Sequence, residues 1–354
     1  MRAVRMYKPG DLRVEDVPIP VPKAGEALVK VMACGVCGSD IPRVNKYGAH
    51  IAPLTIGHEF SGKIVEVGKD VKEFKPGDRV TVPPLIPCYQ CEWCEKGIYS
   101  LCEEYDYFGS RRDGAMAEYV AVPEANLLRV PDTVGYLDAA TADPCGNALH
   151  GIAQAKLVPG EVFVAYGAGP IGLFAVQAAK DMGAGTVFAV DMGAEKIKVA
   201  RECGADIAID AAKEDPAEVI RRETNGAMAN VVIDFTGAPA AQKKAIGCAG
   251  KMARVVFLGI SHQGLDLDEK QVDHIMRGQI SVIGSWNSFT KPFPGDDWFK
   301  GLELFKRGAV TAGPMISHKL PLEDAPEMFR AIDRGGIYFN KVLFLPHGEN
   351  FGEE

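Results

Sequence analysis

Four cysteines crowd into the stretch IPCYQCEWCEKGIYSLC, at a spacing of C-x2-C-x2-C-x7-C. The thiolates of Cys88, Cys91, Cys94 and Cys102 would suit a tetrahedral zinc site, in which each sulfur lies about 2.3 Å from the metal. A bacterial iron–sulfur run needs a fourth cysteine three residues on, followed by proline, whereas Cys102 comes later and precedes Glu103. Zinc is the preferred interpretation, with a cluster, disulfides or free thiols as alternatives. A site closed by four protein sulfurs has no position for substrate, so the chemistry must lie elsewhere.

A second set of reactive side chains lies outside this stretch. The segment ACGVCGSD contains Cys37 and Ser39, TIGHEFSG contains His58 and Glu59, and TADPCGNALHG contains Asp143. Taken singly, a cysteine is more often a small core residue and a histidine is more often hydrogen-bonded within the fold. Together they indicate an open zinc site of cysteine, histidine and carboxylate, with one position left for water or substrate.

The stretch VFVAYGAGPIG has the G-x-G-x-x-G spacing of a dinucleotide-binding loop. It follows an apolar run and opens a helix-like segment, and Asp191 ends the next apolar run. The helix N-terminus would offer amides to a pyrophosphate, and Asp191 would bind ribose hydroxyls and repel a 2′-phosphate. NAD is therefore preferred over NADP, although Lys196 weakens the preference. An ordinary strand-to-helix turn with a capping acid is the alternative. The predicted cofactor-binding residues are Gly167, Gly169, Pro170, Ile171, Gly172, Asp191, Lys196 and Gly259.

The elements that must position these residues fall into three parts. Residues 1–148 should be rich in strands, because runs such as GEALVKVMACGV and GKIVEVG are bounded by glycine and proline. This part includes the cysteine lobe, residues 86–103. Between 149 and 285, six short apolar runs alternate with helix-like segments, which predicts an α/β, doubly wound parallel sheet. Residues 286–354 end in the strand KVLFLP, and we expect this segment to return to the first domain.

Composition narrows the class of protein. The 354 residues are 47% hydrophobic, which is enough for two domains. A net charge of −8 without a basic stripe argues against nucleic acid as a partner, and so against a zinc ribbon that binds DNA or RNA. No run approaches the ~18 apolar residues of a membrane span, and the start MRAVRMYKPG has no apolar signal core. The scattered remaining cysteines fit a reducing cytoplasm, where we expect the protein to act.

In their order along nearly the whole chain, these motifs resemble the zinc-dependent medium-chain dehydrogenases. The shared stretches are CGVCGSD, GHEFSG, KPGDRV, the four-cysteine lobe, GAGPIG and the acid after the second strand of the nucleotide domain. The resemblance implies a GroES-like β-barrel catalytic domain and a Rossmann domain, assembled as a homodimer or homotetramer. It also implies an oxidoreductase that moves hydride between a secondary alcohol and NAD, with one catalytic and one structural zinc ion per subunit.

The resemblance also implies roles for the reactive side chains. Cys37, His58 and Glu59 would ligate or flank the catalytic zinc, and Ser39 would hydrogen-bond the substrate alcohol and take its proton first. Asp143 stands where polyol dehydrogenases usually have glutamate. Because aspartate is one methylene shorter, we expect it to bind the metal through water or only when the cleft closes.

A second departure concerns the route by which the proton leaves. Many relatives have a histidine three residues after the hydroxyl residue, where this chain has Pro42. The remaining candidates for the proton route are Glu59, ordered water and His50.

Basic residues bear on the identity of the substrate. The stretches GAHIAPLTIGHEFSG, YDYFGSRRDG and VIGSWNSF are similar to members that act on sugar-alcohol phosphates. A phosphate needs a cationic clamp, for which arginine is favoured. Arg43 and Arg111 are the predicted clamp, beside Lys46 and Arg112, although a solvated surface charge is the ordinary state of each.

Two further positions are predicted to contact substrate. Trp286 and Asn287 stand where sorbitol-type relatives have a substrate-contacting arginine and tyrosine, although Trp286 could equally serve packing. The expected substrate is thus a small-molecule polyol or a sugar-alcohol phosphate such as galactitol 1-phosphate. Two alternatives stay open: L-threonine or another amino alcohol, favoured by DPCGNALHG, and a non-catalytic protein that binds NAD and zinc on the same scaffold.

Overall fold

The computed structural model describes residues 1–349, which form two compact units. The first unit comprises Met1–Asp143, Ser288–Lys306 and the chain from Ile316 onward. The second comprises Pro144–Asn287 and Arg307–Met315. The division after Asp143 falls within α4 (Ala142–Ala155), so this residue lies in the first turn of a helix that continues into the second unit. No helix of the described part of the chain is both long and apolar enough to span a membrane.

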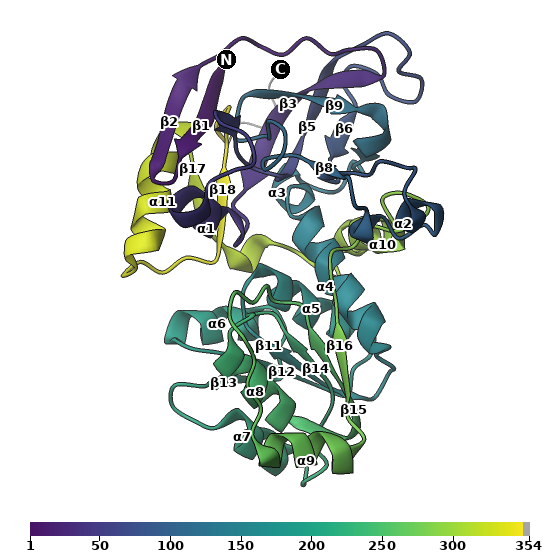
Figure 1. Ribbon diagram of the computed structural model, residues 1–354, viewed down its shortest axis with the longest axis vertical. Helices are drawn as coiled ribbons and strands as arrows, with labels where there is room; N and C mark the ends of the chain where they lie inside the picture. Colours follow the sequence, from purple (N-terminus) through teal and green to yellow (C-terminus); the bar gives the residue numbers. More distant parts are fainter. Residues whose placement is uncertain (350–354) are drawn as a thin grey trace. The chain divides into compact units, whose positions relative to one another are not determined.

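The body of the first unit is a seven-stranded, mostly antiparallel sheet in the order β10-β6-β5-β3-β18-β17, with β9 also paired to β3 (Figure 1). Strand β3 is central, because it pairs antiparallel with β5, β9 and β18. Its residues are almost all buried, as expected for a strand with neighbours on both edges. The bounds are β3 Glu26–Gly35, β5 Glu59–Val67, β6 Arg79–Thr81, β9 Tyr119–Pro123, β10 Leu128–Arg129, β17 Ile316–Leu320 and β18 Lys341–Phe344.

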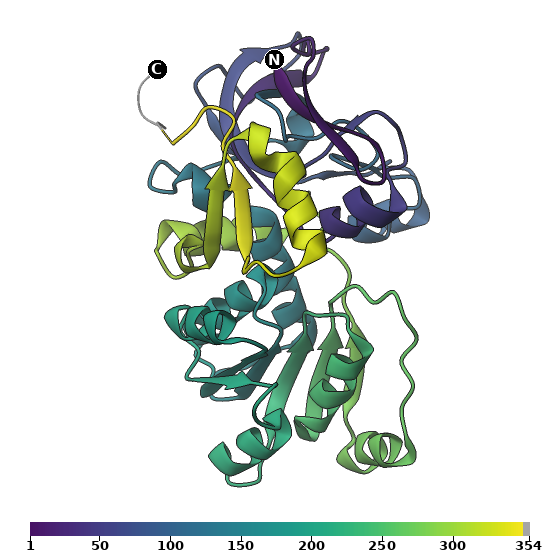
Figure 2. The ribbon, with the colours of Figure 1, turned by 90° about the vertical axis from the view of Figure 1, so that its left-hand side faces the viewer.

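Shorter elements complete this unit. A three-stranded sheet has the order β2-β1-β4, and β7 pairs with β8 beside the cysteine lobe. Figure 2 shows the C-terminal strands in yellow beside α11, whose apolar face carries the buried Met328, Phe329 and Ile332. The bounds are β1 Arg2–Lys8, β2 Asp11–Asp16, β4 Leu54–Thr55, β7 Leu85–Ile86, β8 Asp106–Tyr107, α1 Asp40–Pro42, a π-helical turn Arg43–Tyr47, α2 Glu92–Glu95, α3 Tyr136–Ala139, α10 Asp296–Lys306, α11 Ala325–Arg334, and 3-10 turns at Tyr99–Leu101, Glu124–Asn126 and Leu322–Asp324.

The second unit contains a six-stranded parallel sheet in the order β13-β12-β11-β14-β15-β16. Its central strands are continuous apolar runs, because helices cover both faces of a parallel sheet. Strand order reverses between β11 and β14, the point at which such sheets bind nucleotides. The bounds are β11 Val162–Tyr166, β12 Thr186–Asp191, β13 Ile207–Asp210, β14 Ala229–Asp234, β15 Ala249–Phe257, β16 Ser281–Gly284, α5 Pro170–Asp181, α6 Ala194–Glu202, α7 Pro216–Glu223, α8 Pro239–Gly247, α9 Glu269–Gly278 and a 3-10 turn Gly313–Met315.

All six apolar runs singled out in the sequence are strands of this parallel sheet, so the predicted α/β, doubly wound architecture is confirmed. The strand order, which places the first strand at the centre, is that of a dinucleotide-binding Rossmann sheet.

Candidate active site

The side chains predicted to form an open metal site meet in the first unit. The ligand atoms of Cys37, His58 and Glu59 all lie within 4.8 Å of one another. Cys37 lies just beyond β3 and Glu59 begins β5, and these strands pair so that Gly35 lies opposite Glu59. A sulfur, a nitrogen and an oxygen at this spacing suit zinc, which binds sulfur at about 2.3 Å and nitrogen or oxygen at about 2.0–2.2 Å.

Asp40 braces this site from behind. It is fully buried, and its Oδ1 lies 3.4 Å from His58 Nδ1. The Cys37 amide donates to its Oδ2 at 3.1 Å, and the Arg43 guanidinium donates to its Oδ1 at 2.7 Å. Burial alone would raise the pKa of Asp40, but the His58 and Arg43 charges lower it on balance. A carboxylate behind one imidazole nitrogen is the usual partner of a metal-binding histidine.

The electrostatics of His58 favour a cation. Burial would lower the pKa of its imidazole, but the negative charges of Asp40 and Cys37 outweigh burial and raise the pKa well above its usual value. These anions stabilise positive charge at the imidazole, and a metal ion in place of the extra proton satisfies the same demand. The residues present therefore fit a divalent metal.

Glu59 has a partner that the sequence analysis missed. Lys341 on β18 is 1% exposed, and its ammonium forms an ion pair with Glu59 Oε2 and donates to the Val36 carbonyl at 3.0 Å. Burial would lower the pKa of Lys341, but the charges of Glu59 and Cys37 raise it on balance. A single cation at the start of the otherwise apolar run KVLFLP was the signal available in the sequence.

Two further predicted residues, Asp143 and Ser39, interact with the group formed by Cys37, His58 and Glu59. Asp143 is buried, and burial together with the Glu59 charge raises its pKa to about 7, against the opposing effects of His58 and Lys341. Among the described residues, Asp143 is not part of the three-ligand group. The Ser39 hydroxyl donates to Cys37 Sγ at 3.3 Å.

A row of aromatic and basic side chains starts at the imidazole. The Tyr107 ring meets the His58 ring edge-on, with centroids 5.5 Å apart. The Tyr105 ring lies 6.1 Å from the Tyr107 ring, again edge-on, and the Arg111 guanidinium lies 4.5 Å from the centre of the Tyr105 ring. Burial and the charge of Asp143 raise the pKa of the Tyr107 hydroxyl well above its usual value.

Arg43 and Arg111, the two arginines predicted to bind phosphate, both influence the pKa of His50. Partial loss of solvent and the positive charges of Arg111 and Arg43 lower the pKa of His50, so both guanidinium groups lie within electrostatic range of this imidazole. His50 is exposed, in contrast to Glu59, so the two candidates for the proton route have very different access to solvent.

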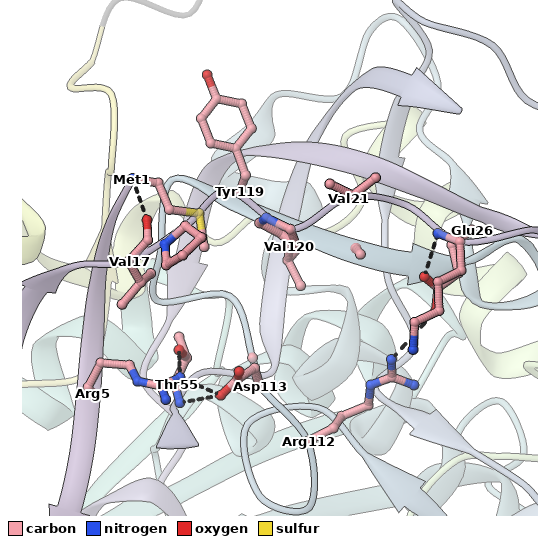
Figure 3. Close-up of a pocket in the computed structure, with 15 residues that line it drawn as sticks. Met1, Arg5, Val17, Val21, Glu26, Thr55, Arg112, Asp113, Tyr119 and Val120 are labelled. Atoms are coloured by element: carbon pink, nitrogen blue, oxygen red, sulfur yellow. Dashed lines mark hydrogen bonds and ion pairs between the residues drawn. The ribbon is translucent and has the colours of Figure 1, made fainter. Parts of the chain in front are cut away.

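Arg112 faces a separate cavity of the first unit, with a volume of about 480 Å³ (Figure 3). Its guanidinium lies 3.7 Å from Glu26 and 3.5 Å from Asp106. Arg5, on the same cavity, donates to Asp113 at 2.8 Å. The cavity wall includes the N-terminal segment around Val17 and Val21 and contains none of the metal-site residues. The charges of both arginines are balanced within this cavity.

The four cysteines of the lobe form a second potential metal site. Their ligand atoms also lie within 4.8 Å of one another, and all four are free thiols. The Cys88 amide donates to Cys102 Sγ at 3.3 Å, and Cys88 Sγ lies 3.9 Å from Cys94 Sγ. Amides of Glu103 and Cys94 lower the pKa of Cys91 to about 6, whereas burial raises the pKa of Cys94 to about 12. This donor set suggests a structural zinc.

The lobe packs on the segment that returns to the first unit after Asn287. Tyr99 meets Phe293 edge-on at 5.7 Å, and Phe293 stacks on Phe289 at 6.3 Å. The Ser100 amide donates to the Phe289 carbonyl at 3.0 Å. The lobe therefore has an aromatic anchor in addition to its sulfurs.

The glycine loop lies at the switch point of the second unit. Gly167 has a φ of 112°, and a Cβ on Gly172 would lie 1.9 Å from the Gly167 carbonyl oxygen, so only glycine fits there. The Asp191 carboxylate accepts the amides of Ala168 and Met192, both at 2.7 Å. Asp191, at the end of β12, therefore holds the glycine loop in place and also puts a negative charge beside it.

The other predicted cofactor residues surround this loop. Gly169 is the N-cap of α5 in extended conformation, and Pro170 and Ile171 begin the helix, whose N-terminus has no side-chain cap. Lys196 Nζ lies 4.0 Å from the Asp191 carboxylate. A Cβ on Gly259 would lie 2.1 Å from the Gly237 amide nitrogen, so the backbones after β14 and β15 approach closely here.

The predicted substrate residues Trp286 and Asn287 belong to the second unit. Trp286 is 47% exposed, so it does not serve the core of that unit. Asn287 has a φ of 45°, a left-handed conformation that asparagine tolerates better than most residues.

Comparison with known proteins agrees with this architecture. The alcohol dehydrogenase GroES-like domain matches residues 23–132, and the zinc-binding dehydrogenase model matches residues 170–307. Galactitol 1-phosphate 5-dehydrogenase of Escherichia coli is 35% identical over 349 residues, which cover 98% of this chain and 100% of the relative. L-threonine 3-dehydrogenase of Symbiobacterium thermophilum is 34% identical over 356 residues, covering 98% of each chain.

Solved structures give the same result. The crystal structure of galactitol-1-phosphate dehydrogenase from Escherichia coli superposes with a TM-score of 0.92 at 35% identity, covering 98% of this chain and 100% of that one. A zinc-binding dehydrogenase from Sinorhizobium meliloti, bound to NADP, superposes with a TM-score of 0.89 at 32% identity, covering 98% and 99%.

The chain belongs to the zinc-dependent medium-chain dehydrogenases, with a GroES-like domain followed by a Rossmann domain, as the sequence motifs predicted. Within that family it is similar to galactitol 1-phosphate 5-dehydrogenase over its full length, which the stretch YDYFGSRRDG had indicated. It is therefore an oxidoreductase of the polyol and alcohol dehydrogenase class, in which NAD is the typical hydride carrier.

Proposed function

We propose that the enzyme oxidises a secondary hydroxyl of a sugar-alcohol phosphate such as galactitol 1-phosphate, with NAD as hydride acceptor. The observation that carries this proposal is that the Arg111 guanidinium has no carboxylate partner among the described residues. Among residues 1–349, no carboxylate forms an ion pair with it, although its guanidinium is held over Tyr105 at 4.5 Å. An oriented arginine without a counter-ion suits a phosphate, which carries roughly −1.5 to −2 charges at neutral pH.

Charge around Arg111 supports an anion at this position. Arg43 and Arg111 both act electrostatically on His50, so two guanidinium charges contribute to the positive potential around that imidazole. Arg43 already donates to Asp40, and we assign it a supporting role in which its remaining donors add to the positive potential. Arg111 would then make the direct phosphate contact.

The chain's own residues would prepare the reacting hydroxyl. Cys37, His58 and Glu59 would hold the catalytic zinc, with Asp143 approaching it through water. When bound, this zinc would act as a Lewis acid and make a substrate hydroxyl easier to deprotonate. Ser39, whose hydroxyl donates a hydrogen bond to Cys37 Sγ, would accept the proton first and release its own hydroxyl proton to Glu59, ordered water or His50.

Two buried charged groups would keep this arrangement rigid. Asp40 would fix the His58 ring through its contact with Nδ1, which leaves the other ring nitrogen for the metal. Lys341 would hold one oxygen of Glu59 and leave the second oxygen for the site. The four cysteines of the lobe would bind the second, structural zinc of each subunit.

For the cofactor, we propose NAD rather than NADP. The Asp191 carboxylate is fixed by two amides at the end of β12, where it would accept ribose hydroxyls and repel a 2′-phosphate. Lys196 offsets part of that repulsion, but at 4.0 Å it is paired with the same carboxylate.

The test is a substrate panel run on the zinc-loaded enzyme: galactitol 1-phosphate, galactitol, sorbitol and L-threonine, each with NAD and with NADP. We expect the phosphate ester with NAD to have the highest kcat/KM. Arg111→Gln should lower kcat/KM for galactitol 1-phosphate about 10- to 100-fold, the cost of one or two charge-assisted hydrogen bonds, and leave galactitol nearly unaffected.

Arg112→Gln is the matched control, because the neighbouring arginine faces the separate cavity and pairs with Glu26 and Asp106. Equal losses in the two variants, or equal rates of the parent on galactitol and its phosphate, would contradict the phosphate assignment.

L-threonine is the second candidate, because a threonine dehydrogenase is 34% identical and the α4 motif resembles that branch. Its carboxylate is also an anion that Arg111 could bind. A higher kcat/KM on L-threonine than on any sugar alcohol or its phosphate would show that L-threonine is the substrate.

A further inference from the structure

Tyr107 lies between the predicted metal ligand His58 and the side chains of Tyr105 and Arg111. It ends the two-residue strand β8, where it lies opposite Leu85 of β7. Its ring contacts the imidazole of His58 on one side and the ring of Tyr105 on the other. Because Arg111 lies over Tyr105, the row runs from a predicted zinc ligand to the predicted phosphate contact through two phenol rings.

The hydroxyl of Tyr107 has no hydrogen-bond partner among the residues that the structure describes. Within residues 1–349, no group donates to it or accepts from it, although the side chain is only partly exposed. Tyr7 provides a contrast, since its hydroxyl donates to Glu15 at 2.9 Å. Because this side chain is only partly buried, solvent can complete the hydrogen bonding of the hydroxyl, and a ligand group that displaces the solvent must do the same.

The surroundings of this hydroxyl select for a neutral, hydroxylated ligand group. The groups that act on it electrostatically, Asp143, Cys37, Glu59 and Asp40, are all acidic, and none of these four offers a positive charge to an anionic ligand group. A sugar alcohol presents hydroxyls on every carbon between the reacting one and the phosphate. Such hydroxyls can both donate to and accept from a phenol.

We propose that Tyr107 is a specificity-determining residue that hydrogen-bonds a non-reacting hydroxyl of the substrate, between the carbon oxidised at the metal and the anion held at Arg111. The inference rests on the proposed function for the position of the anion, but its core is narrower: Tyr107 distinguishes polyols from alcohols with one hydroxyl. An alcohol without a second hydroxyl leaves the phenol unpartnered, and sites built to bind a hydroxyl discriminate strongly against analogues that lack it.

The test compares Tyr107→Phe with the parent enzyme, using galactitol 1-phosphate, galactitol and 2-butanol as probes. Phenylalanine keeps the ring packed on His58 and removes only the hydroxyl. We expect KM for the two polyols to rise about tenfold with kcat nearly unchanged, and the kinetics on 2-butanol to stay the same. Calorimetric titration of galactitol 1-phosphate into the zinc-loaded enzyme without NAD, where no turnover occurs, should show the same tenfold weakening.

Two controls separate this role from a structural one. Tyr119→Phe removes a phenol hydroxyl on β9, whose ring packs on His347 in another part of the first unit, and should leave binding unchanged. Zinc content and melting temperature of Tyr107→Phe should equal those of the parent. A loss of similar size on 2-butanol and on the polyols, or a fall in zinc content, would overturn the proposal, and so would unaltered polyol binding.

The outcomes also separate this inference from the proposed function. If the parent binds galactitol and its phosphate equally and Arg111→Gln has no effect, the phosphate assignment fails. The Tyr107 inference is tested separately, by whether Tyr107→Phe raises KM for galactitol without changing KM for 2-butanol.

Discussion

The buried ion pair between Lys341 and Glu59 allows a quantitative test of how the metal centre is stabilised. Lys341→Met keeps most of the apolar stem of the side chain but removes its charge, and it leaves the Glu59 carboxylate, which is 3% exposed, without its ammonium partner. Removing one partner of a buried pair costs about 3–5 kcal/mol, because the remaining charge is desolvated and uncompensated. The Val36 carbonyl also loses a donor.

For a unit of this size, 1 kcal/mol corresponds to roughly 2–4 °C, so the expected fall in melting temperature is about 6–20 °C. The assay is calorimetric melting of the apo and zinc-loaded forms. Zinc should recover part of the loss in Lys341→Met, because a second cation then compensates the carboxylate. The double variant Lys341→Met/Glu59→Gln should be more stable than the single variant in the apo form, since no charge is left uncompensated.

Lys319→Met on the adjacent strand β17 is the matched control. Lys319 lies 3.4 Å from Glu349, but the two side chains are 38% and 64% exposed. Exposed pairs contribute about 0–1 kcal/mol, so this variant should melt within a few degrees of the parent. If Lys341→Met costs no more than Lys319→Met, the pair does not stabilise the unit and the reasoning is refuted.

Three further predictions follow from the same structure. Asp191→Ser should raise kcat/KM with NADP at least tenfold relative to NAD, measured by initial rates, and an unchanged ratio would deny Asp191 its selecting role. Cys94→Ser should lower bound zinc from two equivalents to one and reduce the melting temperature, while a variant that keeps both ions would exclude the lobe as a zinc site. Burial would raise the pKa of Asp206, but Lys180 and the Val187 amide lower it on balance. The ionised carboxylate therefore stabilises the folded protein fully above its ordinary pKa of 3.8, and this contribution is lost as the pH falls through the lower pKa of the folded state. Asp206→Asn should therefore be less stable than the parent in urea at pH 7, and this difference should shrink as the pH falls below 3.8; a difference independent of pH would contradict this.

Local patterns predicted much of this molecule because their information is contained within short segments. The glycine loop, the six apolar runs of the second unit and the cysteine spacing each fix geometry over about ten to twenty residues. The residue types suggested grouping Cys37 with His58, but their proximity depends on the pairing of β3 with β5, which no short segment encodes.

The sequence analysis did not identify Lys341 or Tyr107, and it could not distinguish the surroundings of Arg111 from those of Arg112. Lys341 reaches Glu59 across 282 positions of the chain, and no local pattern encodes that pairing. Tyr107 lies in a two-residue strand, too short for a periodic signal. Arg111 and Arg112 are adjacent in sequence yet face different surroundings, a distinction that only backbone direction settles.

The interrupted first unit also has a consequence for biosynthesis. The second unit is almost continuous along the chain, so most of it can fold while the ribosome is still translating the remainder. By contrast, β3 acquires its neighbour β18, and Glu59 its ammonium, only after the segment Lys341–Phe344 has been translated. Until that segment emerges, the end of β3 around Cys34 and Gly35 lacks this neighbour and the Glu59 carboxylate lacks its ammonium.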